Sequence, residues 1–202
     1  MLTTILDMAG VAVFAISGAL AAARAGQTIV TFALFAAVTG IGGGTLRDLL
    51  IDAPVFWVGR SDYLGVCLVA AAAVWFIKTE RWPLTALLWF DAIGLGAYAV
   101  IGTSKALSYG LPPLPAITMG VLTACFGGIL RDVLAGEPSI ILRPEIYVSA
   151  AALGASAFVT AASFGAPTPL ATGIGFAAGF GLRALAIARG ISLPSYRAHA
   201  DD

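Results

Sequence analysis

Seven stretches of predominantly apolar residues alternate with short polar segments along the chain. About 20 apolar residues are enough to cross a bilayer as a helix, and most of these stretches approach or exceed that length. The predicted spans are Ile5–Ala23, Thr28–Ile51, Tyr63–Ile77, Leu84–Thr103, Leu111–Ala135, Ile146–Phe164 and Leu170–Ala188. The pattern therefore predicts an all-α integral membrane protein with seven transmembrane helices in one compact bundle.

The composition agrees with this class and excludes several others. Hydrophobic residues make up 59% and charged residues 11% of the chain, and the mean hydropathy is +0.95. Eleven basic and eleven acidic residues cancel, so no field favours nucleic acid as a partner. His199 is the only histidine, and Cys67 and Cys125 lie in apolar runs, so no metal site is expected. No nucleophile–base–orienter set is visible, so an enzyme with catalytic residues is not expected either.

The placement of lysine and arginine predicts the orientation of the chain. With the N-terminus outside and the C-terminus in the cytoplasm, only Arg47, Arg60 and Lys105 of the eleven basic residues fall on the outer side. Basic residues collect on the cytoplasmic side of membrane proteins. We therefore expect this orientation in the cell inner membrane, with membrane lipids as partners.

The strongest signal in the chain is an internal repeat. Residues 7–63 align with residues 91–147 without a gap, at a constant shift of 84 positions. The matched pairs include Asp7 and Asp91, Arg47 and Arg131, Asp48 and Asp132, Pro54 and Pro138, and Tyr63 and Tyr147. Chance aligns alanines and glycines in so biased a sequence, but it does not readily place Arg-Asp, Pro and Tyr in one register.

Each copy of the repeat carries three predicted spans. An odd number sends the second copy into the membrane from the opposite side, so the two copies are expected to be inverted, as in many transporters. The expected units are residues 1–83 for the first three-helix repeat, 84–168 for the second, inverted repeat, and 169–202 for the seventh helix and a short polar tail. The glycines of the seventh helix favour close packing or oligomerisation.

Glycine clusters lie at equivalent positions of the two repeats. They comprise Gly42, Gly43 and Gly44 in the second span, and Gly127 and Gly128 in the fifth. Glycine costs about 1 kcal/mol in a helix interior, and freed backbone is tolerated in a membrane where it faces protein or a water-filled cavity. We therefore predict that both helices break at a central aqueous path. Close helix packing through small residues is the alternative.

Charged residues follow both glycine clusters inside apolar sequence. Such charges are costly in a membrane and mark pathways or paired sites. Adjacent residues on a helix do not face each other, so each arginine is expected to pair with a different carboxylate. The two expected groups are Asp7, Arg47 and Asp48 near the outer face, and Asp91, Arg131 and Asp132 near the inner face. In the alternative, the aspartates cap helices and the arginines reach the interface.

Other polar residues near the clusters are weaker candidates. Lys105 ends the fourth span where the first repeat has Ala21, so it is either a tuning charge on the path or a lysine that reaches the interface. Hydroxyl groups that could line the path belong to Ser17, Thr39, Thr45 and Thr123. In the alternative, these hydroxyls bond back to helix carbonyls.

The paired motifs resemble a known family. Gly-Gly-Gly-x-x-Arg-Asp in one three-span repeat, answered by Gly-Gly-x-x-Arg-Asp in the other, resembles the trimeric intracellular cation channels, and the short chain resembles their bacterial and archaeal members. The resemblance covers nearly all of residues 1–190. It implies a homotrimer in which each protomer encloses a pore for monovalent cations, potassium in particular. It implies no cofactor beyond a permeant K⁺ or Na⁺ ion.

These observations predict a potassium channel whose pore lies between the glycine-broken second and fifth helices. Asp48 and Asp132 would contribute negative potential, and Arg47 and Arg131 would hold a gate or constriction. One alternative is a secondary transporter for a small solute such as an amino acid, because broken helices bind carboxylates in such proteins. Another is a structural subunit without a path of its own.

Overall fold

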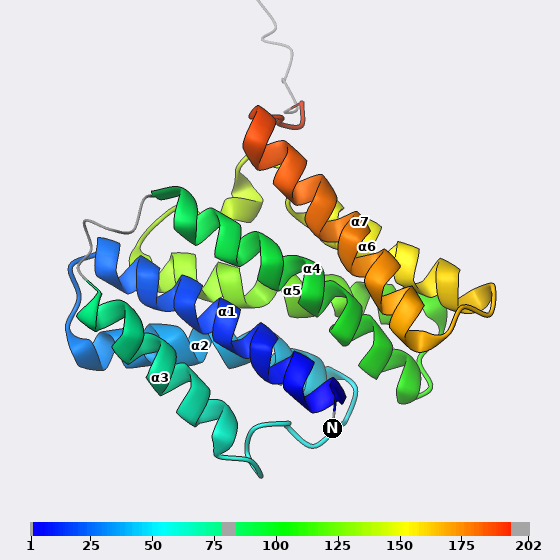
Figure 1. The fold of residues 1–202 in the computed structure, drawn as a ribbon, viewed down its shortest axis with the longest axis horizontal. Helices are drawn as coiled ribbons and strands as arrows, with labels where there is room; N and C mark the ends of the chain where they lie inside the picture. The colour runs from blue at the N-terminus through cyan, green and yellow to red at the C-terminus, as the bar shows by residue number, and fades with distance from the viewer. Residues whose placement is uncertain (1, 78–83, 195–202) are drawn as a thin grey trace, which may run out of the picture.

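The structure, a computed structural model, describes residues 2–77 and 84–194. In this part of the chain, seven α-helices coincide with the seven predicted spans to within five residues at either end. The helices are α1 (Leu2–Arg24), α2 (Ile29–Leu50), α3 (Asp62–Phe76), α4 (Leu84–Ser108), α5 (Pro113–Ala135), α6 (Val148–Ser163) and α7 (Thr168–Arg189), with a short 3₁₀-helix η2 (Ile140–Leu142) before α6. Figure 1 shows their arrangement.

Local sequence explains where several helices begin and end. α2 begins after Thr28, whose side-chain oxygen accepts a hydrogen bond from the backbone N–H of Thr31. α5 and α7 carry proline in the first turn, where no helical hydrogen bond is lost. Gly136 and Gly190 end the same two helices in the left-handed conformation, with φ of 69° and 63°.

The helices differ in how far they reach across a membrane. α1, α2, α4, α5 and α7 are long and apolar enough to cross one. α3 and α6 are apolar but have only 15 and 16 residues. At 1.5 Å per residue such helices reach only about 24 Å, less than the roughly 30 Å of a hydrocarbon core. The seven predicted spans are therefore five full-length helices and two short ones.

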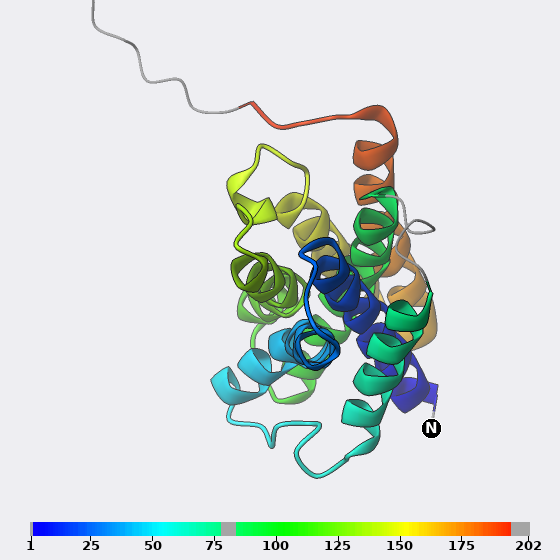
Figure 2. The same ribbon diagram turned by 90° about the vertical axis from the view of Figure 1, so that its left-hand side faces the viewer.

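The two repeats pack against each other through α1, α2, α4 and α5. α3 lies against α1 and α2, and α6 lies against α4 and α5, so each short helix stays with its own repeat (Figures 1 and 2). α7 packs on α4 and α6 and therefore joins the second repeat. The predicted architecture, two three-helix repeats and a seventh helix, is confirmed.

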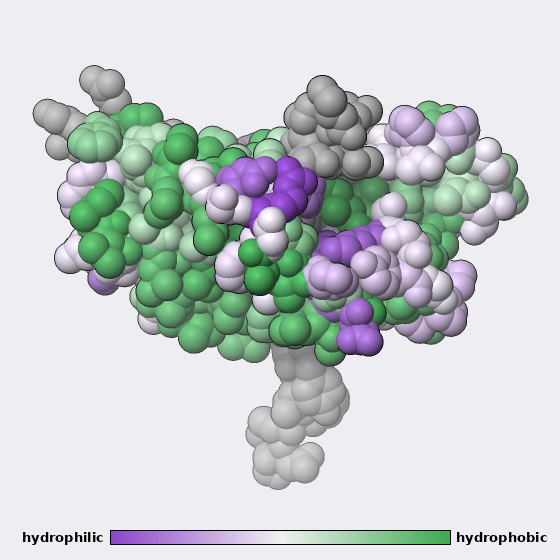
Figure 3. Space-filling model, turned by 90° about the horizontal axis from the view of Figure 1, so that it is seen from below, coloured by the Kyte–Doolittle hydropathy of each residue, from purple (hydrophilic) through white to green (hydrophobic). Residues whose placement is uncertain are grey.

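Apolar side chains cover much of the outside of the bundle. Val30, Phe76, Leu142 and Phe164 are between 75% and 88% exposed. Figure 3 shows one face on which apolar residues dominate and polar residues gather in patches. Several charged residues are buried instead, which reverses the pattern of a water-soluble protein. Such a surface suits a lipid environment.

The glycine clusters lie where α2 crosses α5. A Cβ atom at Gly43 would overlap the carbonyl oxygen of Thr123, and one at Gly127 would overlap the carbonyl oxygen of Thr39. Adding the repeat shift of 84 to residues 43 and 39 gives residues 127 and 123. The contacts are therefore reciprocal, as a two-fold relation between the repeats requires.

The predicted break at the glycines is wrong. α2 is helical without interruption from Ile29 to Leu50, and α5 from Pro113 to Ala135. Helical hydrogen bonds satisfy the backbone inside a membrane, so the clusters keep the helix and permit close approach instead. The remaining cluster glycines also face close neighbours: Gly42 faces Leu130, Gly44 faces the Phe56 ring, and Gly128 faces the Tyr147 hydroxyl.

Candidate functional site

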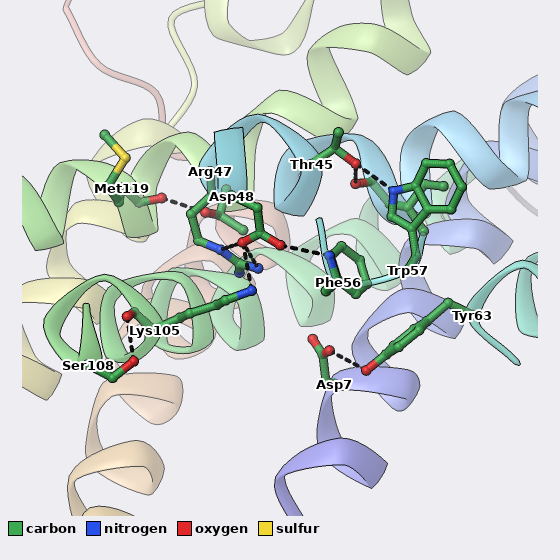
Figure 4. A network of polar contacts seen from close by, with 12 residues as sticks. Asp7, Thr45, Arg47, Asp48, Phe56, Trp57, Tyr63, Lys105, Ser108 and Met119 are labelled. Atoms are coloured by element: carbon green, nitrogen blue, oxygen red, sulfur yellow. Dashed lines mark hydrogen bonds and ion pairs between the residues drawn. The ribbon is translucent and has the colours of Figure 1, made fainter. Parts of the chain in front are cut away.

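Asp48, in the last turn of α2, is the centre of a buried group of charges (Figure 4). Its Oδ1 atom lies 2.8 Å from Arg47 Nη2 and 2.8 Å from Lys105 Nζ, which reaches over from α4. Its Oδ2 atom accepts a hydrogen bond of 3.0 Å from the backbone N–H of Phe56. The Asp48 side chain is fully buried, whereas that of Lys105 is 25% exposed. We call Arg47, Asp48 and Lys105 the Asp48 site.

Arg131, in the last turns of α5, is the centre of a second buried group. Its Nη1 atom lies 2.5 Å from Asp91 Oδ1 on α4 and donates a hydrogen bond of 2.7 Å to the hydroxyl of Ser17 on α1. Its Nη2 atom lies 2.8 Å from Asp132 Oδ1. The Arg131 side chain is 2% exposed and that of Asp91 is 1% exposed. We call Arg131, Asp91, Asp132 and Ser17 the Arg131 site.

The two sites share a scaffold that follows the repeat. The backbone N–H of Ile140 donates to Asp132 Oδ2 at 2.9 Å, just as Phe56 donates to Asp48. The chain then turns back at both places, because a residue five positions beyond each aspartate donates its N–H to the backbone carbonyl of that aspartate. The inverted repeat therefore places two equivalent carboxylates at corresponding ends of α2 and α5.

The charges of the two sites differ. The Asp48 site combines two cations with one carboxylate, and the Arg131 site combines one cation with two carboxylates. Part of this difference in charge comes from Lys105. This residue belongs to the second repeat, but its position near the end of α4 brings it to the Asp48 site of the first repeat. Lys105 is thus part of an ion pair, and its side chain is 25% exposed.

Asp7 lies beside the Asp48 site but pairs differently from its counterpart Asp91. Tyr63 donates its hydroxyl to Asp7 Oδ2 at 2.8 Å (Figure 4). Tyr98 donates its hydroxyl to the Asp7 carbonyl at 3.2 Å. No ion pair joins Asp7 to Arg47 within residues 2–77 and 84–194. Asp91 therefore forms the predicted ion pair within its group of charges. Asp7 lies near its group but is hydrogen-bonded to tyrosines instead.

The prediction that each arginine pairs with a different carboxylate is wrong for Arg47 and half right for Arg131. Arg47 Nε donates to Asp48 Oδ1 at 2.8 Å, and Arg131 Nε donates to Asp132 Oδ1 at 2.9 Å. The arginine side chain is long enough to fold back along the helix to its neighbour. Only Arg131 also binds a carboxylate from another helix.

The hydroxyl candidates have different partners. Thr45 donates to the Ile41 carbonyl at 2.7 Å and Thr123 donates to the Met119 carbonyl at 2.5 Å, which is the back-bonding alternative. Thr45 also accepts from the Trp57 indole N–H at 2.9 Å. The Thr39 hydroxyl is buried without a partner among the described residues and packs against Gly18.

A cavity of about 510 Å³ opens beside the Arg131 site. Its charged lining residues are Arg24, Arg131, Asp132, Glu137, Arg143 and Glu145. Four of these lie at the end of α1 or between α5 and α6, and they are not among the predicted site residues because they fall outside the apolar spans. The repeat gives no signal for them, because the positions 84 residues away hold the uncharged residues Ser108, Ala53, Gly59 and Ser61.

The N-terminal end of α3 shows an exposed pair for comparison. Arg60 donates to Asp62 at 2.7 Å, and both side chains are close to half exposed. The hydrogen bond to Asp62 raises the pKa of Arg60. Exposed pairs of this kind contribute little to stability, whereas removal of one partner from a buried pair is strongly destabilising.

Comparisons with known proteins agree on one group of relatives. Residues 4–79 and 88–163 match the family described as Glycine transporter. The chain is similar in structure to the trimeric intracellular cation channel orthologue from Rhodobacter sphaeroides, with a TM-score of 0.89 and 49% identity over 94% of this chain and 99% of that one. It is 40% identical to a UPF0126 membrane protein of Vibrio cholerae, over 95% of this chain and 82% of the relative. It is 39% identical to the inner membrane protein YadS of Escherichia coli, over 97% of both chains.

Proposed function

This chain belongs to the trimeric intracellular cation channel family as a prokaryotic member, and on that premise we propose that it is a potassium channel with one pore in each protomer. The pore runs between α2 and α5 and joins the Arg131 site to the Asp48 site. One observation carries this placement: two buried charged sites lie at corresponding ends of the α2–α5 crossing, and one of them borders a cavity.

In this proposal the structure is the closed state of the pore. α2 and α5 touch backbone to backbone at Gly43 and Gly127, which leaves no room for an ion at the crossing. Separation of the two helices would expose the carbonyl oxygens of Thr39 and Thr123 to the path. Carbonyl oxygens can replace part of the hydration shell of a cation.

The charged sites supply the two entrances of the proposed pore. Asp48 and Asp132 contribute negative potential, and Arg47 and Arg131 hold the constriction on either side of the crossing. Because Asp48 and Asp132 are each ion-paired with an arginine at 2.8 Å, selectivity between monovalent cations is expected to be modest.

We propose the assembly and orientation on the same basis. The chain forms a homotrimer in the inner membrane, as the name of the Rhodobacter sphaeroides relative states trimerisation for that protein. The N-terminus lies outside, which puts the cavity beside the Arg131 site on the cytoplasmic side.

Single-channel recording tests the function directly. Purified protein in a planar bilayer with asymmetric potassium chloride should give unitary current steps that reverse toward the potassium potential. A reversal potential close to that of chloride, or a current that depends on neither ion, would contradict the proposal.

The family description favours a second candidate, a transporter for a small amino acid such as glycine. Saturable uptake of radiolabelled glycine into liposomes that contain the protein, together with an absence of unitary currents from the same preparation, would support the transporter. Currents without saturable uptake would support the channel.

A further inference from the structure

α7 lies outside the repeat, yet one of its residues is tied to the Arg131 side of the molecule. Arg183 is 2% exposed although α7 is a peripheral helix. Its Nη2 atom lies 2.6 Å from Glu145 Oε2, and its Nη1 atom donates to the Ile146 carbonyl at 3.3 Å. The guanidinium also lies over the Tyr147 ring, 5.3 Å from the ring centroid. All three contacts fall on the segment that leads into α6.

The chain after α7 contacts the same segment. Ser192 pairs with Glu145 in an isolated antiparallel bridge, and the Leu193 N–H donates to the Pro144 carbonyl at 2.7 Å. Figures 1 and 2 place this end of α7 on the side of the bundle where the loop after α5 lies. Residues 144–147 are therefore held from α7 by a side chain and from the following residues by backbone.

The segment that α7 holds forms part of the cavity and reaches the Arg131 site. Glu145 lines the cavity wall together with Arg143. The Tyr147 hydroxyl lies beside Gly128 of α5. Asp91 Oδ1, from α4, and Arg131 Nη2 lie close to the same face of Gly128. Tyr147 is 1% exposed, so it cannot move without disturbing these neighbours.

Within residues 2–77 and 84–194, no buried arginine from another helix holds the equivalent segment of the first repeat. Residues 60–63 occupy the equivalent place, and there the arginine, Arg60, forms an exposed pair with Asp62, the first residue of α3. Tyr63, the counterpart of Tyr147, also lies under a guanidinium, that of Arg60 at 5.2 Å, but this arginine is exposed and comes from the adjoining loop. Tyr63 donates its hydroxyl to Asp7. The restraint is thus a property of one entrance and not of the repeat.

We infer that Arg183 is a positioning residue for the pore entrance beside the Arg131 site. Through Glu145 and Tyr147 it fixes the cavity wall and holds the Arg131 site in its closed geometry. Release of Arg183 frees residues 144–147 and raises the probability that the pore opens, while the current through an open pore stays the same. This inference rests on the proposed channel function.

The test compares Arg183→Met with Arg189→Met, which removes an equal charge from an exposed position on the same helix. Open probability in planar bilayers should rise by about tenfold for Arg183→Met, since hydrogen bonds to a charged group are lost. Arg189→Met should stay within about twofold, as expected for a surface charge. Arg183→Lys keeps the charge near Glu145 and should restore part of the wild-type behaviour.

A second readout does not depend on current. A cysteine at Ala135, a half-buried residue of the cavity wall, should react faster with a membrane-impermeant thiol reagent when Arg183 is methionine. The reaction is measured above the background of protein without the added cysteine. Leu193→Pro removes the N–H that binds Pro144 and leaves α7 intact, so it should act in the same direction if Arg183→Met does not fold.

The outcomes separate the two claims. A wild-type protein without currents contradicts the channel proposal, whereas the thiol reaction still tests the restraint. Equal open probability and equal reactivity in the two methionine variants would overturn the role of Arg183. Faster thiol reaction with unchanged open probability, or a changed unitary current, would also overturn it, because the restraint would then be structural or part of the conducting path.

Discussion

Arg47 and Lys105 share one carboxylate, whereas Asp91 and Asp132 share one guanidinium. A buried charge that loses its partner is strongly destabilising. The consequences of a substitution therefore depend on which charge has a second partner. Lys105 is the most exposed member of the Asp48 site, and Asp48 keeps Arg47 and the Phe56 N–H when the lysine is removed.

Lys105→Met should therefore fold and should increase the unitary potassium current. The change removes one positive charge from the proposed entrance, and a unit charge at 4 Å is worth about 1 kcal/mol even in bulk water, or roughly fivefold in local cation concentration. We expect an increase of up to about fivefold at low ionic strength and a smaller one at high salt. Unitary currents at two potassium chloride concentrations provide the measurement.

Arg60→Met is the matched control for this prediction, because it removes an exposed positive charge from the same predicted side of the membrane. It should change the current much less than Lys105→Met. Equal effects of the two substitutions would show that the Asp48 site is no closer to the path than the loop surface.

The sequence identifies these charges but not their partners. Charges inside apolar sequence indicate buried pairs, and Asp91 and Arg131 do pair. Contact between neighbours such as Arg47 and Asp48 depends on the side-chain rotamer, which helical spacing does not determine. The partner of Asp7 is Tyr63, and the only sequence feature that pointed to Tyr63 was its match to Tyr147 in the repeat.

At the scale of elements, the crossing of α2 and α5 depends on glycines that have no space for a side chain. Gly43→Ala would push a methyl group into the Thr123 carbonyl, and overpacking of this kind costs about 1–3 kcal/mol. We expect the free energy of unfolding to fall by that amount. In the proposed channel, the two helices are also driven apart, so open probability should rise.

Gly181→Ala is the comparison for this change, because nothing lies within 4 Å of a Cβ atom at Gly181. Its effect on the free energy of unfolding should stay below about 1 kcal/mol, the intrinsic difference between glycine and alanine in a helix. Detergent-based unfolding of both variants measures the difference. If Gly43→Ala were as stable as Gly181→Ala, the crossing would be looser than the structure has it.

The helices and the repeat could be predicted from the sequence, because length and hydropathy identify the helices and a constant register identifies the repeat. The role of the glycines could not, because glycine in an apolar span is compatible both with a break and with close packing. The uninterrupted helix is favoured by a membrane, which offers no water to unpaired backbone. The reciprocal contacts of Gly43 and Gly127 then supply the reason for the clusters.

For the whole molecule, the two repeats carry charged sites of opposite charge excess, and in the part of the chain that the structure describes α7 holds the segment beside the Arg131 site alone. The orientation of the chain decides which of the two charged sites meets ions from the cytoplasm and which meets ions from outside. Positive-inside counting predicts that the cavity and the C-terminal end of α7 face the cytoplasm and that the Asp48 site faces the outside.

Cysteines at two exposed loop positions test this orientation. Gly59→Cys lies in the loop after α2 and Gln27→Cys in the loop after α1, on opposite ends of α2. A membrane-impermeant maleimide should label Gly59→Cys in intact cells and Gln27→Cys only after permeabilisation, because both native cysteines are buried. The reverse pattern would move the cavity and the Arg183 restraint to the outer face, and Lys105 would then act on potassium that leaves the cytoplasm.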